Sequence, residues 1–465
     1  MENLLHVVQT VNSYLSDYVL IVLLVLTGLY FSIRTKFVQV RCFCEGWRTM
    51  FSRFSLNGKG SGKGLSSFQA LTAAVAAQVG TGNIVGASGA ILVGGPGAIF
   101  WMWIIAFLGM STIYAEAILA QKTRVVNSDG TISGGPVHYI HHAFPNVFGK
   151  VLAVFFAISA IIALGFVGLT VQANSIGETC NSAFHFPQWG TMIFLVVFSF
   201  LIFIGGVSRL GAVTEKIVPF MAVLYLIGGL IILACRITYI PQTFGLIFRY
   251  AFHPEALLGG GLGAALKIAI SQGVKRGLFS NEAGMGSTPH AHAQAMVSKA
   301  HEQGVLAMMG VFLDTFVVLT MTALVVISTI YTGNGPLANI AGNSYSELLT
   351  ASGLTKTNLV PAAFGSIMGS SIAGWFVAIS LFFFAYSTIL SWSFFGRINF
   401  LYLFGHNRWT ELIYSLIGIC FIAVGTLMQN DLVWELQDMF DQLIVLPNVI
   451  ALIALGKIVV DATKE

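Results

Sequence analysis

The sequence predicts an all-α polytopic membrane protein with about eleven transmembrane helices. Apolar residues make up 56% of the 465 positions, whereas Asp, Glu, Lys and Arg together make up 9%. A soluble domain carries roughly 25% charged residues, so this chain has too few charges for a surface that faces water. One helix across a bilayer takes about 20 apolar residues, and the apolar content is sufficient for eleven such helices. The composition therefore excludes a soluble multidomain enzyme and a disordered protein.

The candidate spans follow one another along the chain with short polar connections. A scan for apolar runs of transmembrane length gives eleven segments: 15–34, 65–93, 97–120, 151–177, 190–208, 212–235, 256–297, 305–331, 366–395, 410–428 and 432–460. The N-terminal stretch has no basic residues before its first apolar run and no small-residue cleavage site after it, so we expect no removable signal peptide.

The distribution of Lys and Arg predicts the orientation, because cytoplasmic loops retain positive charge. If the N-terminus lies outside and the C-terminus in the cytoplasm, nineteen of the 23 basic residues fall on or near the inner face, seven of them between residues 34 and 63. The exceptions are Arg236, Arg249, Lys267 and Lys356. We therefore expect a multi-pass cell-membrane protein with this orientation.

Two of the eleven segments are expected to be interrupted helices. The run Ala76–Gly86 holds three glycines with Thr81 and Asn83 between them, and the run Ser271–Gly284 is similarly rich in glycine and polar residues. Glycine and small polar residues make a poor helix interior, and non-helical backbone is tolerated at membrane depth only around a cavity or inside protein. Close helix packing is the alternative role for such glycines.

The position of the two interruptions predicts an internal repeat. Without the first span, the remaining ten form two blocks of five, and an interrupted segment begins each block. An odd number of spans per block makes the two copies run in opposite directions, and interrupted segments at matching positions are typical of secondary-transporter binding sites. We therefore divide the chain into an N-terminal helix with a basic inner loop (1–64), a first five-helix repeat (65–235) and a second (256–460).

Polar residues inside predicted spans are costly and are candidates for function. Gln172 and Asn174 are expected to face the interior, where Gln172 contacts a substrate or forms an interhelical hydrogen bond. Asp314 binds or relays a cation, or pairs with a basic residue such as Lys275 or Arg276. Lys267 either takes part in coupling or extends its side chain toward the interface.

Two adjacent hydroxyls, Ser387 and Thr388, interrupt an apolar helix. Such hydroxyls often bond back to the carbonyl one turn earlier. Alternatively, hard cations such as Na⁺ prefer oxygen ligands, and these two hydroxyls with carbonyls from the first interrupted segment would form such a shell without formal charge.

Other cofactor and partner classes find no support in the sequence. The net charge of +4 is too small to suggest nucleic acid. The stretch SLNGKGSGKG at 55–64 lacks the Ser or Thr, and the preceding strand, that a nucleotide-binding P-loop requires. The cysteines, among them Cys42 and Cys44, do not have the spacing of a zinc site or of a disulfide framework. The histidines do not form a convincing metal site either; for example, His301-Glu302 lacks the second histidine of a zinc-protease motif. We expect no enzyme, no resident cofactor and no metal other than a coupling ion.

Several motifs together resemble the alanine or glycine:cation symporter family, also called the sodium:alanine symporter family. They are GTGNIVG (80–86), GGPGAIFWMW (94–103), YAEAILA (114–120), GVKRGLFSNEAGMGS (273–287), FLDT (312–315) and FFAYST (383–388). The resemblance implies a fold of the bacterial leucine-transporter type, with one extra N-terminal helix before a 5+5 inverted repeat. It also implies sodium-coupled uptake of small neutral amino acids.

The resemblance also implies site residues. Carbonyls of Ala76, Val79 and Phe384 with the hydroxyls of Ser387 and Thr388 would hold sodium. The substrate residues would be Gln78, Gly80, Thr81, Gly82, Asn83, Gln172, Gln272 and Gly273, with amides of residues 80–82 on the carboxylate and unwound backbone near Gln272–Gly273 completing the pocket. Asn83 also matches an asparagine that contacts a second sodium in the leucine transporter; that second site is not assumed here.

The expected function is therefore sodium-coupled import of alanine, glycine or D-alanine across a lipid bilayer by alternating access. Two alternatives share the fold. One is a proton-coupled permease with Asp314 or Glu282 as carrier. The other is a sodium-coupled carrier of a larger polar amino acid such as glutamine, which Gln272 and Lys267 make possible because both depart from the family pattern. An ion channel is a weaker alternative, since channels usually line their pores with repeated rings from several subunits.

Overall fold

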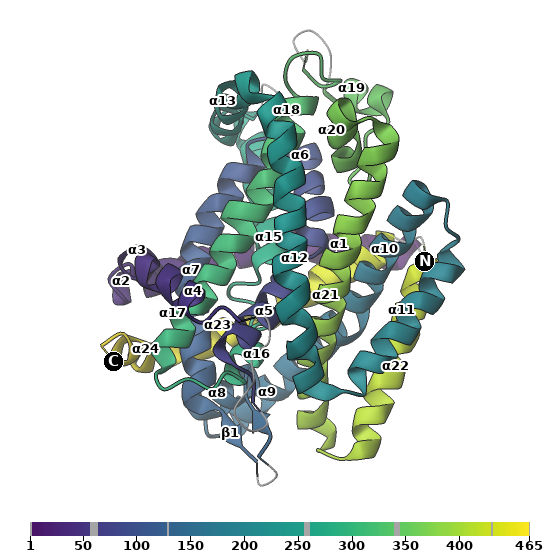
Figure 1. Cartoon of the computed structure of the whole chain (residues 1–465). Helices are drawn as coiled ribbons and strands as arrows, with labels where there is room; N and C mark the ends of the chain where they lie inside the picture. The colour runs from purple at the N-terminus through teal and green to yellow at the C-terminus, as the bar shows by residue number, and fades with distance from the viewer. Residues whose placement is uncertain are drawn as a thin grey trace.

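The computed structural model of the chain describes residues 2–55, 64–127, 130–254, 261–338, 345–428 and 431–464. These residues are helical almost throughout, and the two termini lie on opposite sides of the molecule (Figure 1). Most of the predicted connector at 55–64, including Lys59 and Lys63 of the expected basic inner loop, falls outside the described residues.

The helices of the first half are α1 (Glu2–Tyr14), η1 (Leu15–Leu20), α2 (Ile21–Arg34), α3 (Val38–Arg41), α4 (Phe43–Ser52), α5 (Ser67–Gln78), η2 (Gly82–Gly86), α6 (Ala87–Gly94), α7 (Ala98–Thr123), α8 (Pro136–Ala143), α9 (Val147–Ala160), η3 (Ile161–Val167), α10 (Gly168–Phe184), α11 (Gln188–Phe203) and α12 (Gly206–Cys235). Two short antiparallel strands, β1 (Val125–Val126) and β2 (Ile132–Ser133), join α7 to α8.

The helices of the second half are η4 (Ile237–Tyr239), α13 (Ile240–Phe252), α15 (Leu262–Asn281), α16 (Pro289–Ala293), α17 (Ala300–Val311), η5 (Phe312–Leu319), α18 (Thr320–Ile330), α19 (Tyr345–Ser352), α20 (Leu359–Met368), α21 (Ser370–Phe404), α22 (Arg408–Leu427), α23 (Asp431–Ala454) and α24 (Gly456–Ala462). Segments η1, η2, η3 and η5 are π-helical, and η4 is a 3₁₀ turn.

Within the described residues, eight helices are long and apolar enough to cross a membrane, or nine if α5 and η2–α6 count as one bent span. Each of the eleven predicted segments contains a helix, so the all-helical polytopic class is confirmed. Two of these helices fall short of a full span by themselves. Helix α11 has only 16 residues, and α15 carries Lys267, Lys275 and Arg276 along its length.

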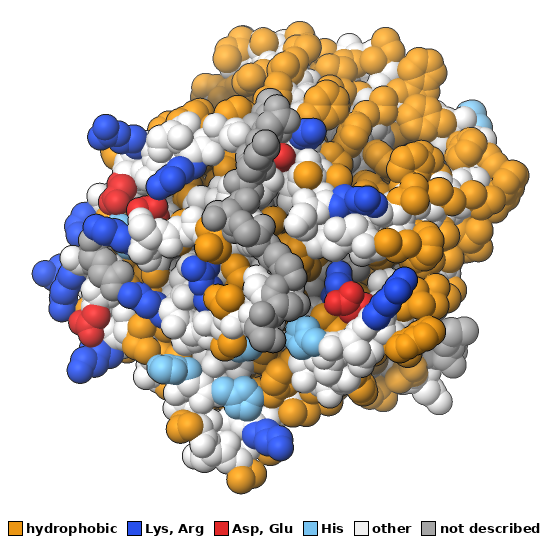
Figure 2. Space-filling model, turned by 60° about the horizontal axis from the view of Figure 1, so that its bottom comes forward, with side chains coloured by type: hydrophobic (Ala, Val, Ile, Leu, Met, Phe, Trp, Pro, Cys, Tyr) orange, Lys and Arg blue, Asp and Glu red, His pale blue; other side chains and the backbone are white. Residues whose placement is uncertain are grey.

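The helix ends gather at two opposite faces, as alternating spans require. At one face, the backbone of Leu65 pairs with that of Ala295, and Arg53 forms a 3.0 Å ion pair with Glu302. At the other face, the Tyr345 hydroxyl donates to the Leu92 carbonyl at 3.0 Å. Figure 2, in which the end that carries β1 and α8 comes forward, shows Lys, Arg and His side chains spread over that end and hydrophobic side chains over the adjoining surface.

The first predicted interruption is present. Helix α5 begins with a capping box formed by Ser66 and Gln69, all of its residues are buried, and it ends where Val79 leaves the helical conformation with ψ of 87°. The chain resumes as η2 and α6 after a bend of 43°. A buried, bent helix of this kind places its free backbone groups inside the protein, where other elements must satisfy them.

The second interruption lies later than predicted. Helix α15 is continuous through Gln272 and Gly273, so the unwound backbone expected there is absent, and the break follows at 282–288. The reason is packing: a Cβ on Gly273 would lie 2.5 Å from the Trp101 Cβ and 2.7 Å from the Ala98 carbonyl oxygen of α7. This glycine permits close contact between two helices. Positive φ angles appear instead at Glu282, Gly284 and Gly286.

We predict that Gly273→Ala lowers thermal stability, because the added methyl overpacks the α7–α15 contact at a typical cost of about 1–3 kcal/mol. Gly277→Ala is the matched control on the same helix, since its Cβ would meet α7 at an ordinary 3.6 Å. Unfolding of the purified variants in detergent would measure both, and equal melting temperatures would contradict the packing role of Gly273.

Candidate functional site

The unwound turn between α5 and η2 is held by side chains from other segments. The backbone N–H of Gly80 donates to the Asn83 Oδ1 at 3.0 Å, and that of Thr81 donates to the Gln172 Oε1 of α10 at 3.3 Å. These are two of the three amides expected to bind a carboxylate. Each of these two amides therefore points at a side-chain oxygen, and backbone amides arranged in this way can also bind an anion.

The expected sodium ligands largely come together where α5 ends against α21. The Thr388 hydroxyl lies 2.9 Å from the Ala76 carbonyl oxygen and 3.1 Å from that of Phe384. The Ser387 hydroxyl lies 3.5 Å from the Ala76 oxygen and 2.9 Å from the Phe384 oxygen. All these groups are fully buried. The cluster is thus an interior set of neutral oxygens, the ligand type that a hard monovalent cation prefers. Val79 is the residue at which α5 ends, three positions after Ala76.

Gly80 connects the turn to the oxygen cluster. A Cβ at this position would overlap the Thr388 Oγ1 and would lie 3.5 Å from the Gln172 Oε1. Only a glycine lets the hydroxyl and the turn approach so closely. The turn and the hydroxyls of α21 therefore form one continuous site.

Asn83 extends the site to Asp314, and these residues lie in the π-helical segments η2 and η5. The Asn83 amide donates to the Asp314 Oδ1 at 2.6 Å. The same carboxylate accepts from the Ser280 hydroxyl at 2.9 Å and from that of Thr315 at 2.8 Å. Among the described residues, no Lys or Arg forms an ion pair with Asp314. A π-helical segment frequently marks a functional site, and here two such segments meet through a buried carboxylate.

The amide side chains that the sequence places inside the protein are divided between the turn and the helix contacts around it. Gln172 reaches the turn, whereas the Asn174 amide bonds to the Met428 carbonyl and ties α10 to α22. The Gln78 amide donates to the Asn281 carbonyl at 2.7 Å. Gln78 therefore links the ends of α5 and α15.

Gln272 and Gly273 are not brought to the turn. The Gln272 Cβ faces Gly94, where a Cβ would lie 3.1 Å away, at the distal end of α6. Gly273 faces α7, as described above. The part of this segment that lies closest to the turn is instead Phe279 and Ser280, both of which pack on Gly82.

A buried carboxylate, Glu116, clamps the break at 282–288. Glu116 of α7 accepts from the backbone N–H of Gly284 at 3.3 Å and from that of Gly286 at 3.0 Å. Asn448 donates to Glu116 at 2.6 Å and to the Gly284 carbonyl at 2.8 Å. Glu282 accepts a 2.5 Å hydrogen bond from the Trp392 indole. The contacts of Glu116 and Asn448 satisfy backbone groups that the break leaves free.

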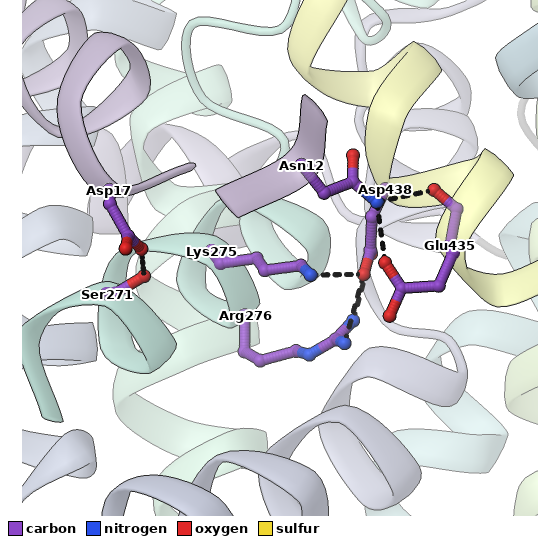
Figure 3. Close-up of polar contacts among 7 residues, drawn as sticks. All are labelled: Asn12, Asp17, Ser271, Lys275, Arg276, Glu435 and Asp438. Carbon is purple, nitrogen blue, oxygen red and sulfur yellow. Dashed lines mark hydrogen bonds and ion pairs between the residues drawn. The ribbon is translucent and has the colours of Figure 1, made fainter. Parts of the chain in front are cut away.

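The basic residues of α15 have partners other than Asp314. Figure 3 shows Lys275 and Arg276 converging on Asp438 of α23, with distances of 2.6 Å and 3.0 Å. Lys275 and Arg276 therefore belong to a mostly buried ion cluster between α15 and α23, and neither pairs with Asp314. Arg276 also stacks near Phe279, which covers Gly82 of the turn.

The N-terminal helix is tied to the same two helices. Asp17, in η1, accepts from Ser271 at 2.5 Å, and the Asn12 amide bonds to Glu435 of α23 at 2.6 Å (Figure 3). Asp17 also pairs with Lys267 at 2.8 Å. Lys267 thus has a fixed ion-pair partner. Asp17, Glu435 and Asp438 were missed by the sequence reading, although acidic residues within predicted spans are themselves a signal.

Comparison with known proteins agrees with this architecture. The model of the sodium:alanine symporter family matches residues 1–465. The chain is 41% identical to the "Sodium/alanine symporter AgcS" of Methanococcus maripaludis, with 98% of this chain and 96% of that protein covered. It is 36% identical to the "Probable sodium/glutamine symporter GlnT" of Bacillus subtilis, with 99% and 90% covered.

The fold is also found among solved structures. The crystal structure of MhsT in complex with L-phenylalanine superimposes with a TM-score of 0.54 and covers 87% of this chain and 100% of that one, at 16% sequence identity. At this identity the likeness concerns the fold alone, which is of the leucine-transporter type. Together with the match along its full length, these findings show that the chain belongs to the sodium:alanine symporter family.

Proposed function

We propose that this protein imports a small neutral amino acid, such as alanine, D-alanine or glycine, together with Na⁺ by alternating access. Membership of the family makes it a cation-coupled amino-acid symporter and not an enzyme. The more specific claims of the proposal are that the coupling cation is Na⁺ and that the amino acid is small and neutral. They are supported by the geometry of the turn and by the name of the 41% identical relative.

The observation that carries the proposal is the position of Thr388. Its hydroxyl lies 2.9 Å from the Ala76 carbonyl oxygen and directly against Gly80. A cation bound between these oxygens would fix the end of α5, and this end determines the conformation of the turn. Binding of Na⁺ would thereby hold the amides of the turn in the conformation that binds the amino acid. Coupling requires such a preference of the ion for one conformation over the other.

The amino acid would replace internal contacts of the turn. Its carboxylate would take the place of the Gln172 oxygen at Thr81, and its ammonium group would bind main-chain carbonyls and the freed Gln172. The Thr81 Oγ1 is buried and has no hydrogen-bond partner among the described residues, so a bound ligand would satisfy it. One Na⁺ that moves down a potential of 100 mV releases about 2.3 kcal/mol, which allows about fifty-fold accumulation.

The proposed orientation places the end that carries β1, α8 and α16 in the cytoplasm. Lys and Arg side chains spread over this end (Figure 2), and basic residues near the ends of spans are retained inside. The N-terminus would then be outside and the C-terminus inside a cell membrane. The division into five-helix units at 65–235 and 256–460, related by inversion, is part of the same proposal.

Uptake into liposomes is the direct test. The purified chain, reconstituted with an imposed Na⁺ gradient, should accumulate labelled alanine or glycine, and it should not do so with an H⁺ gradient alone. Glutamine belongs in the same panel because the relative GlnT is named for it. Preference for glutamine would replace the substrate assignment, and uptake that ignores Na⁺ would overturn the coupling assignment.

We predict that Ser387→Ala combined with Thr388→Ala raises the Na⁺ concentration needed for half-maximal uptake at least tenfold, because two ligand oxygens are removed. Ser393→Ala is the control on the same helix, because Ser393 lines a separate cavity with Tyr414 and Arg397. Initial rates at varied Na⁺, normalised to the amount of folded protein, would measure the effect. An unchanged Na⁺ dependence would remove this site from the proposal.

Gly80→Ala should also weaken Na⁺ dependence and uptake, since the new methyl would displace the Thr388 hydroxyl. Gly86→Ala, in the same motif, is the matched control because its Cβ would meet nothing closer than 3.7 Å. We expect a loss of at least tenfold in uptake efficiency for Gly80→Ala and less than threefold for Gly86→Ala. If the two variants behave alike, the close contact at Gly80 has no functional role.

A second candidate function is proton coupling through Asp314, which its burial and its lack of a basic partner among the described residues favour. In this case, uptake driven by an H⁺ gradient would persist without Na⁺ in the wild type. Asp314→Asn, which keeps the shape of the side chain and removes its titratable group, would abolish this H⁺-driven uptake. Under pure sodium coupling, H⁺-driven uptake is absent in both proteins.

A further inference from the structure

A cysteine, a glutamate and a histidine meet where the inner-loop helix α4 packs against α17. Cys42 precedes α4, Glu45 lies in its first turn, and His301 lies in the first turn of α17. The two helices are in close contact, since a Cβ on Gly46 would lie 2.9 Å from Met309 and 3.0 Å from the Val305 carbonyl oxygen. The backbone of both helices therefore holds the three side chains in place.

The three side chains converge on one point. One potential ligand atom from each lies within 4.8 Å of the others, and the His301 Nε2 is 3.2 Å from the Glu45 Oε1. Cys42 is 5% exposed and His301 8% exposed, whereas the Glu45 side chain is 51% exposed. The group is consequently buried on the cysteine and histidine side and open to solvent on the glutamate side.

A further residue fixes the orientation of the histidine ring. The hydroxyl of Tyr114, in α7, lies 2.6 Å from the His301 Nδ1, and Tyr114 is fully buried. The ring therefore directs its Nε2 toward Cys42 and Glu45. A hydrogen bond to the second ring nitrogen is the usual support of a metal-binding histidine.

We propose that Cys42, Glu45 and His301 bind a divalent transition metal of the zinc class. Thiolate, imidazole and carboxylate are the ligands that Zn²⁺ takes in proteins, and a thiolate disfavours Mg²⁺ and Ca²⁺. Three protein ligands leave one position for water on the exposed side of Glu45, which makes the metal exchangeable. On binding, the thiol loses its proton to water.

The bound metal would link α4 to α17. Helix α17 continues through η5, which holds Asp314, into α18. A metal bridge would restrain movement of this helix relative to the inner loop, so the expected consequence is slower transport. Slower transport rests on the proposed function, whereas metal binding at Cys42, Glu45 and His301 does not. A measurement can therefore reject either claim without rejecting the other.

Titration of the purified, metal-free full chain with Cd²⁺ tests the site. Thiolate-bound Cd²⁺ absorbs in the ultraviolet, and we expect this band to saturate at one Cd²⁺ per chain and to be reversed by Zn²⁺ but not by Mg²⁺. Cys44→Ser is the matched control, because Cys44 is a free, exposed thiol only two residues away. Cys42→Ser should abolish the band, and His301→Ala should weaken binding at least tenfold.

A thermal shift provides a second readout, since a ligand that binds only the folded state raises its stability. Zn²⁺ should raise the melting temperature of the wild type and of Cys44→Ser, and it should not raise that of Cys42→Ser. If Cys42→Ser fails to fold, Glu45→Gln tests the site in its place, because Glu45 lies on the exposed side. This variant should weaken Cd²⁺ binding at least tenfold. A band that survives in Cys42→Ser or disappears in Cys44→Ser would overturn the site, as would a wild type that binds no Cd²⁺.

Discussion

The structure depends on how the backbone groups freed at the end of α5 are satisfied. Inside a membrane protein, a free N–H or C=O costs several kcal/mol unless another group pairs with it. Here Asn83 and Gln172 provide oxygens for the amides of Gly80 and Thr81, and the hydroxyls of α21 contact the Ala76 carbonyl. The helix remains open at this point because side chains from other segments hold it open.

These supporting groups come from both halves of the chain. Gln172 belongs to the first half, whereas Asp314 and Thr388 belong to the second. The site therefore lies between packed helices, and any movement of α5 against α21 must break or exchange contacts at the turn. In the proposed mechanism, Na⁺ and the amino acid take over these contacts, so their binding favours one arrangement of the two helices over the other.

The charged residues around the site fall into two groups. Lys275, Arg276 and Lys267 are paired with Asp438 and Asp17, which join α15 to α23 and to the N-terminal helix. Asp314, by contrast, is held by neutral donors within the described part of the chain, as are Glu116 and Glu282. Buried charge without a counter-charge is costly. Because Asp314 also bonds to Asn83 of the turn, it is the carboxylate that would carry a proton in the proton-coupled alternative.

The sequence by itself determined the membrane class, the interruption at 80–83 and the oxygens at Ser387 and Thr388, because composition and local backbone preference act within one segment. The tertiary structure decided what lies opposite each residue. Gly80 and Gly273 both occur in glycine-rich spans, yet Gly80 meets the Thr388 hydroxyl in a turn and Gly273 meets Trp101 within a continuous helix. Likewise, only folding brings Asp438 to Arg276, and His301 to Cys42. The spacing of residues along the chain shows which side chains share one face of a helix. Which residues they contact depends on how that face packs against another helix, and this is decided only when the whole chain folds.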